Sequence, residues 1–162
     1  MSEASNMELA TDIIQIGLIV EDAEATARRY QELLGISGWQ VNEVDTRISK
    51  GSNFLHRGKS KAAKAKVVWT NIGKVEIELI EPLDEESVYA EFLADKGPGI
   101  HHVMFSSADF DESTKKLREA GVEELASGEL KDTRFALFDT AATLGLICEF
   151  ADGEALEPDY SL

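Results

Sequence analysis

The chain has 162 residues and a net charge of −15, and 43% of its residues are hydrophobic. These values predict one globular domain, or two fused halves that share a core. They argue against nucleic acid and anionic membranes as partners, because phosphate binding requires cations. No apolar run approaches the ~20 residues that span a membrane, and the acidic N-terminus lacks the pattern of a secretory signal. A cytoplasmic location is therefore expected, and the single cysteine, Cys148, excludes an intramolecular disulfide.

The first part of the chain predicts a strand, a helix and further strands. Residues 13–20, "IIQIGLIV", are rich in Ile and Val, which is typical of a strand. Asp22 is a candidate N-cap for a helix over residues 23–34, and Gly35 follows as its stop. The stretches "AKVVWTN" and "KVEIELIEP" predict two strands joined by a tight turn at residues 71–73.

The second part of the chain repeats this order, which predicts a duplication. The stretch "IHHVMFSS" is a strand candidate, Asp109 caps the helix "DESTKKLREA", and "RFALFDT" and "LGLICEFAD" are closing strands. We therefore predict a single domain over residues 1–162 with two modules. Its parts are module one over 12–83, a linking helix over 84–97, module two over 99–152 and a mobile acidic tail over 153–162.

Basic residues are concentrated in the stretch 47–74, where no acidic residue occurs. The stretch holds half of all Lys and Arg in the chain, namely Arg47, Lys50, Arg57, Lys59, Lys61, Lys64, Lys66 and Lys74. One interpretation is a solvated basic loop. The other is a docking site for an anionic substrate, such as a carboxylate or a phosphorylated carrier like coenzyme A.

Polar residues interrupt the opening strand of each module. Side chains alternate across a strand, so a sheet with helices on one face is expected to be apolar on that face and open on the other. Gln15 falls on the open face of the first strand, and His102 holds the same place in the repeated strand. His101 is predicted to face the helix, together with Val103 and Phe105.

The closing strand of each module also carries an acid on its open face. Glu78 in "IEL" and Glu149 in "CEF" occupy corresponding places, and Glu76 shares the face of Glu78 as a rival for its role. Taken singly, each residue is expected to be solvated or hydrogen-bonded. Their symmetric placement instead favours one site, because an amide oxygen, two carboxylates and an imidazole suit a divalent cation. We therefore predict that Gln15 and His102 bind a metal together with the two acids.

Three stretches carry a resemblance to a known family: "IIQIGLIVEDAEATARRYQELLGI", "VEIELIEPLDEESVYAEFLADKGPGIHHVMF" and "RFALFDTAATLGLICEF". Over about residues 12–151 the chain resembles the vicinal oxygen chelate superfamily, which includes glyoxalase I, methylmalonyl-CoA epimerase and bleomycin-resistance proteins. It is most similar to the epimerase-like and glyoxalase-like branches. The resemblance implies an α+β fold in which two tandem βαβββ modules form a U-shaped mixed sheet around a metal site.

The resemblance also implies roles for individual residues. The four ligand positions of the family fall on Gln15, Glu78, His102 and Glu149, and the ion would be Zn, Co, Mn or Ni. Glu78 and Glu149 would be the catalytic acid and base, one removing a proton next to a carbonyl and the other returning it. A homodimer and a small carbonyl or thioester substrate are the expected partners.

The ligand set departs from that of the epimerases, which usually have His at the first position and Gln at the second. The set found here is closer to that of animal glyoxalase I, and the acid-free stretch 46–75 lacks the further catalytic carboxylate of the epimerases. The leading hypothesis is an epimerase, isomerase or lyase, acting on a substrate such as methylmalonyl-CoA. A lactoylglutathione lyase like glyoxalase I is the first alternative, and a non-catalytic binding protein like those for bleomycin is the second.

Overall fold

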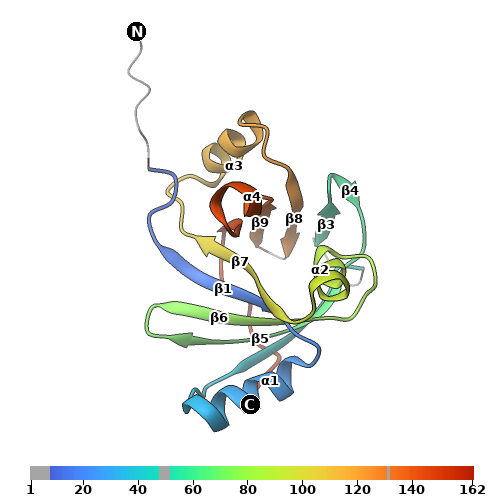
Figure 1. Cartoon of the computed structure of the whole chain (residues 1–162), viewed down its shortest axis with the longest axis vertical. Helices are drawn as coiled ribbons and strands as arrows, with labels where there is room; N and C mark the ends of the chain where they lie inside the picture. Colours follow the sequence, from blue (N-terminus) through green and yellow to red (C-terminus); the bar gives the residue numbers. More distant parts are fainter. Residues whose placement is uncertain (1–7, 48–51, 131) are drawn as a thin grey trace.

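A computed structural model describes residues 8–47, 52–130 and 132–162 (Figure 1). The first seven residues, on which the prediction about a secretory signal partly rests, lie outside the described residues. The helices are α1 (Ala23–Leu34), α2 (Val88–Lys96), α3 (Phe110–Glu119) and α4 (Ala141–Leu144). The strands are β1 (Ile13–Ile19), β2 (Gln40–Asp45), β3 (Asn53–His56), β4 (Lys59–Ser60), β5 (Lys64–Ile72), β6 (Val75–Pro82), β7 (Gly99–Phe105), β8 (Glu124–Leu130), β9 (Thr133–Phe138), β10 (Ile147–Asp152) and β11 (Tyr160–Ser161). None of these helices is long and apolar enough to cross a membrane.

The described strands form one curled, eleven-stranded sheet in the order β11-β2-β5-β6-β1-β7-β10-β9-β8-β3-β4. The two halves mirror each other, because β2-β5-β6-β1 corresponds to β8-β9-β10-β7. In each half the opening strand pairs parallel with the closing strand, and the two opening strands, β1 and β7, pair antiparallel at the centre. The predicted α+β fold of two βαβββ modules forming a U-shaped mixed sheet is thus confirmed.

Each outer edge of the two modules is covered by a segment from the other half of the chain. The β3–β4 hairpin belongs to the sequence of module one, yet β3 pairs with β8 of module two. Conversely, β11 at the C-terminus pairs with β2 of module one. Unpaired strand edges invite association with other chains, so this exchange satisfies two edges that simple modules would leave open.

Helix α1 begins and ends where the sequence predicts. The Asp22 carboxylate accepts a hydrogen bond from the Ala25 amide at 2.8 Å, and Gly35 ends the helix in the left-handed conformation with φ of 71°. The helix packs on the outer face of the sheet, where Ala23 and Ala27 are fully buried. Their cluster also contains Val20, Trp39, Val41, Val68 and Leu79.

The concave face has its own apolar clusters. One of them contains Ile19, Ala65, Val67, Trp69 and Ile80, with Phe92 and Leu93 of α2 packed against it. The linking helix therefore packs on the concave side of the sheet and contacts the central strands β1, β6 and β7. In Figure 1 it lies at one end of these strands, beside the β3–β4 hairpin.

The C-terminal tail, which the sequence predicts to be mobile and acidic, crosses the concave side and joins β2. Leu156 packs against the cluster around Trp69. The Asn42 amide donates to the Glu157 carbonyl at 2.7 Å, and the Tyr160 hydroxyl donates to Glu24 of α1 at 2.7 Å. The tail therefore links module two to the outer edge of module one.

We expect the substitution Leu156→Ala to lower the free energy of unfolding by about 1–2 kcal/mol, because it removes part of an apolar contact between the tail and the sheet. The midpoint of thermal unfolding should fall by roughly 3–6 °C. The matched control is Leu162→Ala, since Leu162 is 42% exposed at the end of the same tail. Equal stability of the two variants would contradict the packing role of Leu156.

Candidate active site

A cavity of about 410 Å³ lies on the concave side of the sheet, between the two modules. Its floor comes from the central strands, which contribute Gln15, Glu76, Glu78 and Glu149. Its walls are mainly apolar and include Phe54, Val67, Trp69, Tyr89, Phe135 and Leu156. The cavity thus combines a polar floor with apolar walls, which is the usual composition of a small-molecule site.

The four predicted ligands converge on one point of this floor. The Nε2 atom of His102 lies 2.8 Å from a Glu149 carboxylate oxygen and 3.7 Å from a Glu78 carboxylate oxygen. The Oε1 atom of Gln15 lies 3.3 Å from the same nitrogen. Three oxygen atoms from three strands therefore surround one imidazole nitrogen, whose ring is only 1% exposed.

The register of the sheet produces this convergence. Two rows of neighbouring residues run across β6, β1, β7 and β10; the first is Glu78, Gly17, His102 and Ile147, and the second is Glu76, Gln15, Met104 and Glu149. In each row, residues paired across the strands project from the same face. The polar residues of both rows therefore gather on the concave face.

Gly17 gives the His102 ring its space. A Cβ atom at position 17 would overlap three atoms of that ring. The imidazole therefore lies directly over the backbone of β1, where any larger residue would displace it. Sequence alternation places Gly17 on the open face, but it carries no sign that the glycine is needed there.

Glu76 holds the amide of Gln15. The Nε2 atom of Gln15 donates a hydrogen bond to the Glu76 carboxylate at 2.6 Å, which leaves Oε1 facing His102. Glu76 is therefore a neighbour of the cluster that orients one of its members, rather than a substitute for Glu78.

The prediction that His101 faces the helix of its own module is wrong. A bulge in the β1–β7 pairing skips His101, because Gly17 pairs with His102 and Leu18 pairs with Ile100. The His101 ring packs edge-on against Phe92 of the linking helix, with ring centroids 5.0 Å apart. Its Nδ1 atom lies 3.0 Å from Nδ1 of His102, within hydrogen-bond distance.

The electrostatics of the cluster distinguish the two histidines. Burial lowers the pKa of His101 to about 3, so this imidazole is neutral. Burial also acts to lower the pKa of His102, but the charge and hydrogen bond of Glu149, with the charge of Glu78, outweigh it and raise that pKa. The carboxylates thus favour the protonated form of His102, whereas His101 contacts Nδ1 of the His102 ring.

The neighbouring carboxylates are crowded and shielded from water. Burial raises the pKa of Glu78 to about 8; His102 opposes this shift, and Glu149 and Glu76 add to it. Burial likewise raises the pKa of Glu76, against the hydrogen bond from Gln15 and in the same direction as the charge of Glu149. Such clusters of perturbed groups in a cavity mark functional sites more often than structural ones.

Comparison with known proteins identifies the family. The profile of the Glyoxalase/Bleomycin resistance protein/Dioxygenase superfamily matches residues 14–138. The chain belongs to this superfamily. One curated relative is the ethylmalonyl-CoA/methylmalonyl-CoA epimerase of Cereibacter sphaeroides, which is 32% identical to this chain over 119 residues. The matched region covers 72% of this chain and 75% of the relative.

Solved structures support the same fold for this superfamily member. The methylmalonyl-CoA epimerase of Streptomyces coelicolor, in complex with 2-nitronate-propionyl-CoA, superimposes with a TM-score of 0.64 at 22% identity; the match covers 90% of this chain and 99% of that one. The methylmalonyl-CoA epimerase of Mycobacterium tuberculosis gives a TM-score of 0.62 at 22% identity and covers 92% of both chains.

The cluster has the donor chemistry of a divalent metal site. One imidazole nitrogen and three side-chain oxygens are ligands that such ions accept in proteins. In residues 8–47, 52–130 and 132–162, no three His, Cys, Asp or Glu side chains are already spaced as a ligand set. Nε2 of His102 lies 2.8 Å from Glu149, and an ion bound between them would replace this contact. The donor types therefore fit a divalent metal.

None of the described Lys and Arg side chains of the stretch 47–74 lines this cavity. Lys50 lies outside the described residues. Five other members form ion pairs with acidic neighbours: Arg47 with Asp45, Arg57 with Glu91 and Glu123, Lys61 with Glu86, Lys64 with Glu43, and Lys66 with Glu24. These pairs favour the interpretation of a solvated, paired surface.

The substitution Gly17→Ala should displace the His102 ring, because the new methyl group would occupy its place. We expect a loss of about 1–3 kcal/mol in stability, as for other overpacked sites, and a changed imidazole environment in NMR spectra. The control is Gly99→Ala on β7, where a Cβ meets open space. The packing role of Gly17 would be refuted by unchanged His102 resonances in Gly17→Ala.

Proposed function

We propose that this protein is a metal-dependent enzyme of the epimerase and isomerase type, which removes a proton next to a carbonyl group. The observation that supports this most directly is the convergence of Gln15, Glu78 and Glu149 around Nε2 of His102 at the floor of an apolar cavity. The relatives named as epimerases favour the same chemistry.

In this proposal the four side chains have two roles, metal binding and proton transfer. Gln15 and His102 hold the ion, with Nδ1 of His102 kept in place by His101. A bound divalent ion supplies Lewis-acid stabilisation of negative charge on a carbonyl oxygen. Glu78 and Glu149 project from equivalent strands of the two modules, so one carboxylate is placed to accept the α-proton and the other to return it.

The substrate class comes from the relatives rather than from the basic stretch. A curated relative is named for ethylmalonyl-CoA and methylmalonyl-CoA, which favours an acyl-CoA thioester. The second candidate is a glyoxalase I-like lyase acting on a hemithioacetal. What favours it is the donor set itself, since an amide, two carboxylates and one imidazole are brought together here.

Added Zn, Co, Mn or Ni should stabilise the folded protein, because the ions bind the folded cluster and not the unfolded chain. The free energy of unfolding should increase by about 2.7 kcal/mol at a free ion concentration roughly 100 times Kd. A rise in Tm would report this increase. His102→Gln should abolish this rise. The control His56→Gln changes a histidine on β3 outside the cavity and should keep it. An equal rise in both variants would place the ion elsewhere.

In deuterated buffer, the Mn-loaded protein should exchange the α-proton of an acyl thioester for deuterium. NMR of the thioester measures the rate of this exchange. Glu149→Gln should slow this exchange by about 10²–10⁴-fold, the usual contribution of a general acid or base. The control Glu43→Gln removes an exposed carboxylate from β2 and should leave the rate unchanged. Full exchange in Glu149→Gln would exclude its catalytic role, and tight binding without any exchange would favour a binding protein.

A further inference from the structure

Tyr89 of the linking helix lies at the cavity wall, close to the polar floor. Its ring centroid lies 5.4 Å from that of His101, in an edge-on arrangement, and 6.4 Å from that of Phe54. His101 in turn contacts His102, with their Nδ1 atoms 3.0 Å apart. A single side chain therefore connects the Tyr89 ring to the imidazole at the centre of the cluster.

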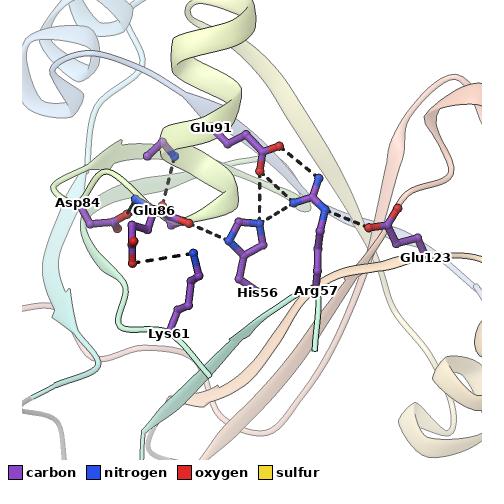
Figure 2. A network of polar contacts seen from close by, with 9 residues as sticks. His56, Arg57, Lys61, Asp84, Glu86, Glu91 and Glu123 are labelled. Carbon is purple, nitrogen blue, oxygen red and sulfur yellow. Dashed lines mark hydrogen bonds and ion pairs between the residues drawn. The ribbon is translucent and has the colours of Figure 1, made fainter. Parts of the chain in front are cut away.

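Polar contacts hold the linking helix against the β3–β4 hairpin. Figure 2 shows Arg57 of the hairpin between Glu91 of the helix and Glu123 of module two, at 2.9 and 3.0 Å. The same view shows His56 beside Arg57, with its Nδ1 atom 2.7 Å from the Glu86 carbonyl oxygen. The aromatic side chain that this helix contributes to the wall is therefore held in place from both modules.

The Tyr89 hydroxyl is an open hydrogen-bonding group of the wall. The other described lining residues with hydroxyl groups are Thr46, which bonds to the backbone of Ala63, and Thr133, which donates to the Glu154 carbonyl. Within residues 8–47, 52–130 and 132–162, no hydrogen bond involves the Tyr89 hydroxyl, and it is not among their fully enclosed polar atoms without a partner. The hydroxyl is therefore accessible to a molecule in the cavity.

The surroundings of Tyr89 keep its phenol protonated. Burial raises the pKa of Tyr89 well above its usual range, and the charges of Glu149, Glu78 and Asp84 act in the same direction. A neutral phenol can donate a hydrogen bond, and a tyrosine hydroxyl in an apolar setting usually has a partner. The wall thus presents a neutral donor for an acceptor atom of the bound molecule.

A substrate carbonyl oxygen has the acceptor chemistry that suits this donor. Such an oxygen has two lone pairs, so that a metal ion and a phenol can bind it together. Negative charge moves to this oxygen when the α-proton leaves, and a donor that is already in place then stabilises the enolate.

We propose that Tyr89 is a further catalytic residue, whose hydroxyl donates a hydrogen bond to the carbonyl oxygen of the substrate and to the enolate oxygen formed from it. In this step the α-proton moves to a carboxylate of the floor. The electron pair of the C–H bond becomes the C=C bond, and the carbonyl π pair moves to the oxygen. Tyr89 keeps its own proton throughout. This inference rests on the proposed function and deepens it.

The test compares two probes that differ at the carbonyl group, namely propionyl-CoA and S-propyl-CoA, in which a methylene group replaces the carbonyl. Calorimetry with the Mn-loaded protein measures the Kd of each probe. In Tyr89→Phe the thioester should bind about 5- to 30-fold more weakly, because a buried acceptor is left without its donor. The Kd of the thioether should stay the same, and the ratio of the two values separates the hydrogen bond from a general loss of packing.

Exchange of the α-protons of propionyl-CoA in deuterated buffer provides the catalytic readout. In Tyr89→Phe the rate at saturating thioester should fall by about 10-fold or more, because the lost hydrogen bond is stronger in the enolate than in the carbonyl compound. The matched control Tyr30→Phe removes the same hydroxyl from a ring in the outer cluster, 5.5 Å from Trp39. It should change neither the ratio of Kd values nor the rate.

These readouts separate the role of Tyr89 from the proposed function. If the wild-type protein exchanges the α-protons and Tyr89→Phe keeps both the ratio and the rate, the role of Tyr89 is overturned and the enzyme proposal stands. Equal weakening of both probes, or an unchanged rate, also overturns the catalytic role. A smaller preference for the thioester in Tyr89→Phe, without exchange by the wild-type protein, supports the hydrogen bond but refutes the enzyme. Failure of both probes to bind the wild-type protein overturns the inference.

Discussion

The antiparallel pairing of β1 with β7 determines the rest of the structure. It joins the two modules along their opening strands and places Gly17 opposite His102. Because each opening strand is also paired with its own closing strand, Glu78 and Glu149 are brought into the same two rows of side chains. A slip of one residue in this pairing would move His102 to the helix-covered face and separate the cluster.

The cluster is a costly arrangement for stability alone. Burying several ionisable groups destabilises a fold unless they are paired, and burial raises the pKa of Glu76 and of Glu78. Within the cluster His102 pairs with Glu149 and lies 3.7 Å from Glu78, and Gln15 bonds to Glu76, so these contacts offset part of the cost of burial. Sites that break local rules while the surrounding structure supports them are where function is expected.

Much of this site could be predicted from the sequence, because strand alternation is a strict, local rule. It placed Gln15, Glu78, His102 and Glu149 on one open face, and the internal repeat related them in pairs. What could not be predicted depends on contacts between distant segments. The bulge at His101 is a property of the β1–β7 pair, and no local pattern near residue 101 marks it.

The same distinction explains the pairing of β3 with β8 and the path of the tail. Residues 53–60 look like part of module one, and the tail looks polar and unstructured, because neither segment has a duplicated counterpart. Yet Phe54, Tyr89 of the linking helix and Leu156 of the tail form apolar walls of the cavity. The duplicated strands therefore provide the polar floor and part of the walls, and the segments outside the repeat provide the rest of the walls. Substrate preference in such a fold can change through the unduplicated segments without disturbing the symmetric cluster beneath them.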